Sequence, residues 1–289
     1  MFTRVIHAGA GALLGVGLLF PSGAPAAPPP EIAARAPLAA PMADGRRFLL
    51  RDPHGGGYAI EVVGDLAQAD RTVVLVPGVA ATLANFDRGL GGVARRAPAV
   101  QARAVLAEIH ATDPAARVAV VAWLGYDPPD VVGLEAAQED RARAGAVALI
   151  HFVARIAAER PATSITLVGH SYGAVVIGLA APRLDRRVTD LVALGAPGMG
   201  VHQARDLHTQ ARVWAAEAPT DWIRRIPGVR VLGLGHGTRP GTPGFGARPL
   251  PTAGAAGHDG YLVPGSSTLH AVALVALGRV DDAATADAG

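Results

Sequence analysis

The segment Ser164–Ala181, SITLVGHSYGAVVIGLAA, decides the fold of this 289-residue chain. It begins with Ile165–Val168, a short apolar and β-branched run that is typical of a buried parallel strand. The pentapeptide GHSYG follows directly at Gly169–Gly173, and an apolar helical pattern begins at Ala174. A strand, a G-x-S-x-G turn and a helix in this order predict a nucleophile elbow.

The elbow has a physical reason for each of its fixed positions. The residues two before and two after the serine lie too close to the neighbouring strand and helix to carry a side chain. The strained turn projects the Ser171 hydroxyl above the sheet, and the backbone N–H of Tyr172 at the helix N-terminus then faces a developing oxyanion. A bare G-x-S-x-G also arises by chance in a chain with 36 glycines. The flanking strand and helix are what favour a nucleophilic serine here.

The rest of the chain alternates between apolar strand-like runs and helical spacing. Strands are expected at residues 47–50, 58–63, 72–76, 117–123, 189–194, 213–216 and 229–234, and helices at 98–110, 135–159 and 266–277. The first two strands are predicted to form an antiparallel hairpin at a sheet edge. Residues 235–257 are rich in Gly and Pro and are predicted to form a long loop. The pattern predicts an α/β fold, a doubly wound and mostly parallel sheet with helices on both faces.

The N-terminus has the three parts of a secretory signal peptide. Arg4 and His7 precede a 13-residue apolar run, which is short for a membrane span, and small residues follow up to Ala26. We therefore predict a signal peptide at residues 1–26, an Ala/Pro-rich tether at 27–45, one α/β domain at 46–280 and a flexible tail at 281–289. The protein is expected to be secreted or associated with the cell envelope, with no stable membrane span after cleavage. An uncleaved membrane anchor is the alternative.

Composition removes several classes of function. Hydrophobic residues make up 50% of the chain and charged residues 17%, as in globular proteins. The formal charge is +2, and the chain has no run of basic residues with interleaved aromatics. Nucleic-acid binding is therefore not predicted. The chain has no cysteine, hence neither disulfides nor thiolate zinc sites. The sequence contains no H-E-x-x-H motif and no G-x-G-x-x-G after a strand, so no metal and no dinucleotide cofactor is predicted.

A serine hydroxyl becomes a good nucleophile only when a histidine takes its proton and a carboxylate orients that histidine. In this fold the chain order is serine, acid, histidine. The acid is expected just after the strand at 213–216, where Glu217 and Asp221 both qualify. Asp221 is favoured because it has room to turn back over the sheet edge, whereas Glu217 lies nearer the strand end.

Three histidines downstream are candidates for the base. His258 is favoured, because it lies on a Gly-flanked loop shortly before the last predicted helix. His236 follows a predicted strand and remains the alternative, as a turn or cleft residue. His270 falls inside the last helix and is expected to be a helix-face residue. His170, next to the serine, is expected to face away from the site and to act only in support.

The oxyanion hole and the cleft walls come from the ends of earlier strands. Gly78 after the strand at 72–76 lets the backbone approach a substrate closely, and Val79 is the expected second N–H donor. Trp123 and Tyr126 lie at the C-terminal end of the next strand, the rim where open α/β sheets bind ligands. One or both are expected to wall the cleft, with core packing as the alternative for Trp123.

Several separated strings resemble one family. They are VVLVPGV at Val73–Val79, AWLGYDPPD at Ala122–Asp130, VGHSYGAVV at Val168–Val176, VWAAEAPTDWI at Val213–Ile223, LGLGHGT at Leu232–Thr238, and FGARPL followed by GHDGYLVPGSSTL up to Leu269. From about Val73 to Arg279 the chain resembles the actinobacterial α/β-hydrolase family with a GHSYG elbow, first catalogued as a domain of unknown function. The resemblance implies the α/β-hydrolase fold and a triad matching Ser171, Asp221 and His258. It implies no substrate.

Together these features predict a secreted serine hydrolase that cleaves a carboxylic ester of a small molecule or lipid. Two alternatives use the same fold. One is a peptidase or acyltransferase at the cell envelope with the same triad, and the other is a non-catalytic binding protein.

Overall fold

The computed structural model describes residues 45–54, 56–231, 233–283 and 285. The predicted signal peptide and all but the last residue of the predicted tether lie outside the described residues, as does most of the predicted tail. Within the described ranges, every helix is too short or too polar to cross a membrane.

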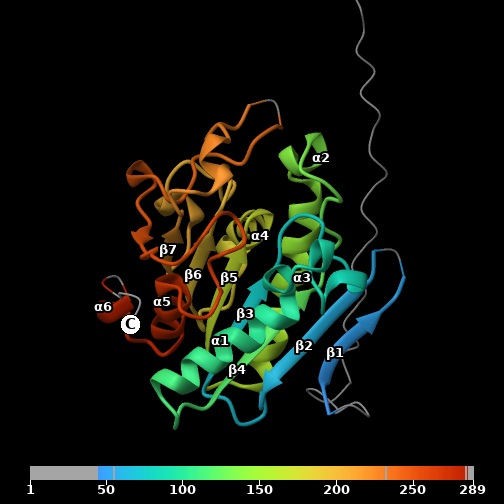
Figure 1. The fold of residues 1–289 in the computed structure, drawn as a ribbon, viewed down its shortest axis with the longest axis vertical. Coiled ribbons are helices and arrows are strands. Elements are labelled where there is room, and N and C mark those ends of the chain that lie inside the picture. The colour runs from blue at the N-terminus through green and yellow to red at the C-terminus, as the bar shows by residue number, and fades with distance from the viewer. Residues whose placement is uncertain (1–44, 55, 232, 284, 286–289) are drawn as a thin grey trace, which may run out of the picture.

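One eight-stranded sheet runs through the molecule in the order β1-β2-β4-β3-β5-β6-β7-β8 (Figure 1). Its strands are β1 Arg47–Asp52, β2 Tyr58–Gly64, β3 Arg71–Val76, β4 Val118–Leu124, β5 Ser164–His170, β6 Val188–Leu194, β7 Arg212–Ala216 and β8 Arg248–Pro249. Strand β2 is antiparallel to β1 and β4, whereas all pairs from β4 to β8 are parallel. The predicted edge hairpin and the mostly parallel sheet are confirmed.

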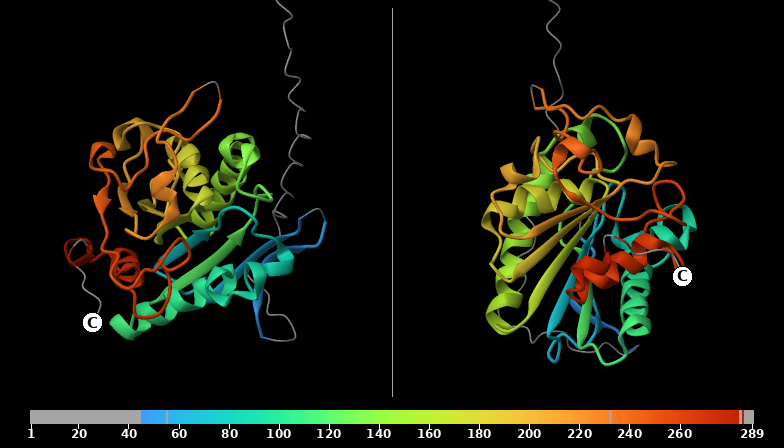
Figure 2. Two further views of the ribbon diagram at one scale, coloured as in Figure 1. Left: turned by 45° about the horizontal axis from the view of Figure 1, so that its top comes forward. Right: turned by 90° about the vertical axis from the view of Figure 1, so that its left-hand side faces the viewer.

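Helices cover both faces of the sheet, as Figure 2 shows. The helices are α1 Pro98–Thr112, α2 Leu134–Ala137, α3 Asp140–Glu159, α4 Tyr172–Ala180, α5 Ser267–Ala276 and α6 Val280–Ala283. Helices α1 and α5 pack together on one face, and α3 and α4 on the other. The central strands are therefore buried on both sides, which explains why they read as continuous apolar runs in the sequence.

The predicted single helix at 135–159 is wrong, because the chain breaks between α2 and α3. The cause is a tertiary contact. The Tyr172 hydroxyl donates to the Gln138 carbonyl at 2.7 Å and accepts from the Ala142 N–H at 3.2 Å. Both partners lie at the break, so the first residue of helix α4 fixes the position where the second helix starts.

The predicted strand at 229–234 is also wrong. Val229, Val231 and Leu234 are 50%, 60% and 41% exposed. Of the residues in this segment that the structure describes, Val231 and Leu234 form an isolated bridge with each other, and none belongs to the sheet. The place beside β7 is taken by β8, inside the segment that was predicted as loop. The apolar pattern of residues 229–234 predicts a strand, but it does not show whether a sheet edge is available for that strand to pair with. The predicted tail likewise begins with a helical turn, because α6 continues to Ala283.

The parallel strands all present their carboxyl ends at one edge of the sheet. Gly78 follows β3, Ser171 follows β5, Gly195 follows β6 and Asp221 comes after β7. Since these four segments meet at the same edge, residues almost 150 positions apart in the sequence reach one site.

Candidate active site

Ser171 occupies the turn between β5 and α4 with strained backbone angles, φ 54° and ψ −125°. Neither neighbouring glycine has room for a side chain. A Cβ on Gly169 would lie 2.6 Å from the Gly173 carbonyl oxygen, and a Cβ on Gly173 would overlap the carbonyl oxygen of Val76. The turn therefore closes only with glycine at both positions, which is the backbone geometry that a nucleophile elbow requires.

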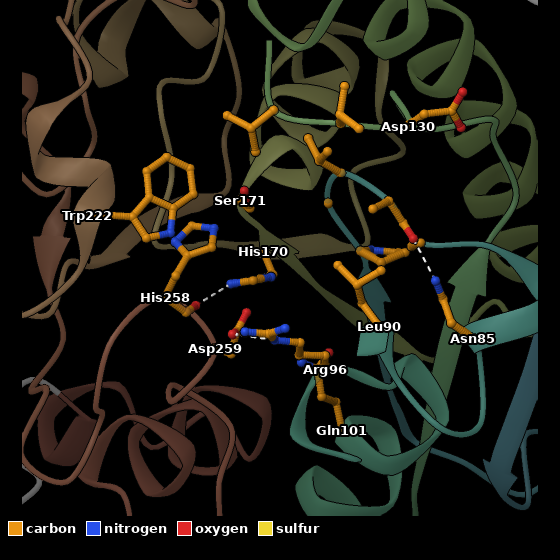
Figure 3. A pocket seen from close by; sticks show the side chains of 17 residues that line it. Asn85, Leu90, Arg96, Gln101, Asp130, His170, Ser171, Trp222, His258 and Asp259 are labelled. Atoms are coloured by element: carbon orange, nitrogen blue, oxygen red, sulfur yellow. Dashed lines mark hydrogen bonds and ion pairs between the residues drawn. The ribbon is translucent and has the colours of Figure 1, made fainter. Parts of the chain in front are cut away.

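Asp221 and His258 form a hydrogen-bonded pair beside the elbow. The Nδ1 of His258 lies 2.9 Å from Oδ1 and 3.0 Å from Oδ2 of Asp221. A carboxylate accepts only, so Nδ1 carries the proton and Nε2 is left as a base. His258 and Ser171 line the same cavity of about 410 Å³. Figure 3 shows Ser171 between His258 and Trp222 on one side and Asn85 and Leu90 on the other.

Two further donors hold the Asp221 carboxylate in place. The Ile223 N–H donates to Oδ1 at 2.8 Å, and the Tyr261 hydroxyl donates to Oδ2 at 2.5 Å. Asp221 is only 3% exposed. Burial on its own raises the pKa of the carboxyl, but the hydrogen bonds from His258, Tyr261 and Ile223 outweigh it and bring the pKa below its usual value. The side chain is therefore an ionised and fully oriented acceptor.

The loop after β3 approaches the serine as closely as a backbone can. A Cβ on Gly78 would lie 2.7 Å from the Cβ of Ser171 and 3.1 Å from the Tyr172 nitrogen. The Tyr126 hydroxyl donates to the Pro77 carbonyl at 2.7 Å and so fixes this loop. Val79 lines the cavity, and the Tyr172 N–H is one of the first-turn donors of α4 that a helix leaves free. The two expected oxyanion donors thus come from adjoining segments.

Trp123 and Tyr126 do not wall the cleft, contrary to prediction. Both are buried, 0% and 1% exposed, and their rings stack at 6.0 Å within the core. The aromatic wall is Trp222, whose ring centroid lies 4.6 Å from that of His258. Its position directly after Asp221 is the one sequence signal for this role.

The alternative triad residues have other partners. Glu217 pairs with Arg239 at 3.0 Å, and His270 pairs with Glu108 at 2.7 Å. His236 is buried with its Nε2 2.7 Å from the Ala136 carbonyl oxygen, apart from the Asp221–His258 pair. Among the described residues, no group of three His, Asp or Glu side chains is arranged to hold a metal ion.

His170 does not face away from the site. It lines the cavity, its ring centroid is 4.8 Å from that of His258, and its Nε2 donates to the His258 carbonyl at 2.7 Å. The loss of water around the ring, together with the charge that His258 can take up, lowers the pKa of His170 from 6.5 to about 4. The ring therefore stays neutral at neutral pH and holds the loop that carries the base.

This lowered pKa predicts a specific pH dependence of stability. Between pH 6.5 and 4 the unfolded chain binds a proton at His170 more readily than the folded chain does. The free energy of unfolding is therefore expected to fall as the pH drops through this window. Urea unfolding at pH 7 and pH 4.5 should show a loss that is larger in the wild type than in His170→Gln, by on the order of 1–2 kcal/mol. Equal losses in the two proteins would contradict this, since the other titrating groups are common to both.

Comparisons with known proteins agree with this architecture. A family model described as alpha/beta hydrolase matches residues 52–231. An uncharacterised protein of Mycobacterium tuberculosis is 28% identical over 261 residues, which cover 78% of this chain and 38% of the relative. An uncharacterised protein of Mycobacterium bovis is 34% identical over 149 residues, covering 50% of this chain and 54% of the relative. The chain thus spans about two fifths to one half of the length of these curated relatives.

Solved structures of hydrolases are similar at low sequence identity. Trichoderma reesei cutinase in complex with a phosphonate inhibitor gives a TM-score of 0.42 at 14% identity, covering 73% of this chain and 77% of that chain. An α/β serine hydrolase without a lid from Xanthomonas campestris gives 0.38 at 16% identity, covering 64% and 76%. Because the family model matches more than half of its length, from the edge hairpin to beyond Asp221, the chain belongs to the alpha/beta hydrolase family.

Proposed function

We propose that this protein is a serine hydrolase that cleaves a carboxylic ester through an acyl-enzyme. Ser171 is the nucleophile, His258 is the general base and then the general acid, and Asp221 orients His258. The observation that carries the proposal is the hydrogen bond from His258 to Asp221, together with the cavity that His258 and the strained Ser171 both line.

In the first half of the reaction, Ser171 Oγ attacks the ester carbonyl carbon while His258 Nε2 takes the hydroxyl proton. The negative charge that develops on the carbonyl oxygen is stabilised by the backbone N–H groups of Val79 and Tyr172. The C–O bond to the alcohol then breaks, and His258 gives its proton to the departing oxygen. In the second half, water attacks the acyl-enzyme by the same route and regenerates Ser171.

An ester is the default substrate because its leaving group needs less help from a proton than that of an amide. The alternative functions for the same fold are those of a peptidase, an acyltransferase and a non-catalytic binding protein. Product analysis with water and a competing alcohol acceptor separates hydrolysis from acyl transfer. The predicted signal peptide supports an enzyme that acts outside the cytoplasm.

Covalent labelling with a fluorophosphonate tests the activated serine directly. The purified wild type is expected to take up one probe per chain, detected by intact-mass spectrometry, and Ser171→Ala is expected to take up none. Folding of both proteins is compared by circular dichroism. A folded wild type that resists the probe, or a Ser171→Ala variant that still reacts, would remove Ser171 from the proposal.

A further inference from the structure

Ser171 lies where two cavities of different size meet. The larger is the one of about 410 Å³ that His258 lines, and the smaller has a volume of about 90 Å³. Four residues line both: Val79, Val132, Ser171 and Trp222. The nucleophile and one expected oxyanion donor thus line both cavities, so a substrate carbonyl at Ser171 has one cavity on each side.

The smaller cavity has mainly apolar walls. Ala136, Ala137 and Pro197 close one part of it, and Ile223 and Ile226 another. His236 also lines it, but burial lowers the pKa of this ring, so the imidazole is neutral at neutral pH. A mainly apolar cavity with no charged side chain among its lining residues suits a hydrocarbon group.

The walls formed by α2 are pinned by hydrogen bonds, so the small volume is a built feature. The Ala136 carbonyl accepts from His236 Nε2 at 2.7 Å, and the Ala137 carbonyl accepts from the Gly235 N–H at 2.8 Å. The carbonyl of the next residue, Gln138, accepts from the Tyr172 hydroxyl at 2.7 Å. Three successive carbonyls of this short segment are therefore tied to the elbow and to the 235–236 loop.

The chemistry decides which half of an ester enters which cavity. The alcohol oxygen must take its proton from His258 Nε2, so the alcohol portion has to lie on the side of the serine that His258 lines. His258 lines the larger cavity and is absent from the lining of the smaller one. Once the alcohol occupies the larger cavity, the smaller one is the space left for the acyl chain.

We propose that the 90 Å³ cavity is the acyl subsite and that the substrates are esters of short acyl groups with a much larger alcohol portion. At roughly 30 Å³ for each water-sized group, the subsite holds an acyl chain of about two to four carbons. This inference rests on the proposed function and adds the substrate class to it. Ile226 and Ala136 are then the residues that set the acyl length.

A series of p-nitrophenyl esters from acetate to dodecanoate tests this with the alcohol held constant. In the wild type, kcat/KM is expected to peak at acetate or butyrate and to be at least tenfold lower for octanoate. Ile226→Ala enlarges the subsite and is expected to raise the octanoate-to-butyrate ratio about tenfold. Ala136→Leu fills the subsite and is expected to lower the butyrate-to-acetate ratio by a similar factor.

Leu90→Ala is the matched control, because Leu90 lines only the larger cavity. Its ratios between acyl lengths are expected to stay within about twofold of the wild type. A wild-type peak at octanoate or longer, or an acyl profile that moves in Leu90→Ala and not in Ile226→Ala, would overturn the subsite assignment. In those cases probe labelling of Ser171 persists and the proposed function stands. No hydrolysis of any ester together with no labelling would overturn both.

Discussion

Replacing Ser171 with alanine is expected to lower kcat for ester hydrolysis by about 10⁵- to 10⁶-fold, the scale seen when a triad serine is lost. The substitution removes only the hydroxyl group, and the other residues that line the two cavities stay the same. Without Oγ, no acyl-enzyme forms, and His258 is left to activate a water that nothing positions. The residual rate comes from the oxyanion donors and substrate binding alone.

The alanine variant should fold, because alanine has the same Cβ as serine and adds no strain at φ 54°. The assay compares wild type and variant on p-nitrophenyl acetate, with a melting curve for each. Adding His258→Ala to the serine variant should reduce the rate little further, because the two residues act as one unit. A loss below about 100-fold for Ser171→Ala would show that another group carries the reaction.

The sequence was sufficient for those parts of the site that depend on neighbours along the chain. The elbow pattern consists of a strand, two glycines and a helix within eighteen residues. The need for Gly169 arises from Gly173 inside the same segment, whereas the need for Gly173 arises from the Val76 carbonyl on the neighbouring strand. Asp221 and His258 follow from chain order in the fold, since each lies after a predictable strand or before a predictable helix. Their hydrogen bond then fits the predicted pairing.

The parts that could not be predicted depend on contacts between distant segments. The hydroxyl of Tyr172 binds the Gln138 carbonyl at the break in the predicted long helix. From its position after the serine, the sequence predicts only that the Tyr172 N–H is an oxyanion donor. Trp123 is at a strand end, yet whether such a ring faces the core or the rim depends on which helix covers it. The same holds for Tyr261, which reaches Asp221 across 40 positions in the chain. Periodicity carries no information on such pairings.

Replacing Asp221 with asparagine is expected to lower kcat by about 10⁴-fold while leaving the fold intact. In the wild type, both carboxylate oxygens are acceptors: Ile223 donates to Oδ1, Tyr261 to Oδ2, and His258 Nδ1 to both. Asparagine has one acceptor and one donor in the same space. With its oxygen on the Ile223 N–H, its amide group faces His258 Nδ1. The imidazole then accepts at Nδ1 and carries its proton on Nε2, where it cannot take the proton of Ser171.

Two comparisons separate this tautomer effect from simple loss of packing. Tyr261→Phe removes one donor to the carboxylate and keeps the Asp221–His258 hydrogen bond, so its kcat is expected to fall only about tenfold. Because the hydrogen bonds on Asp221 hold the pKa of its carboxyl below the usual value, the carboxylate stays ionised from pH 6 to pH 8. The kcat values of wild type and Asp221→Asn on p-nitrophenyl acetate are therefore compared within this range, where the wild-type carboxylate is charged. An Asp221→Asn loss no larger than that of Tyr261→Phe would mean that Asp221 serves the packing of the loop and not the proton on His258.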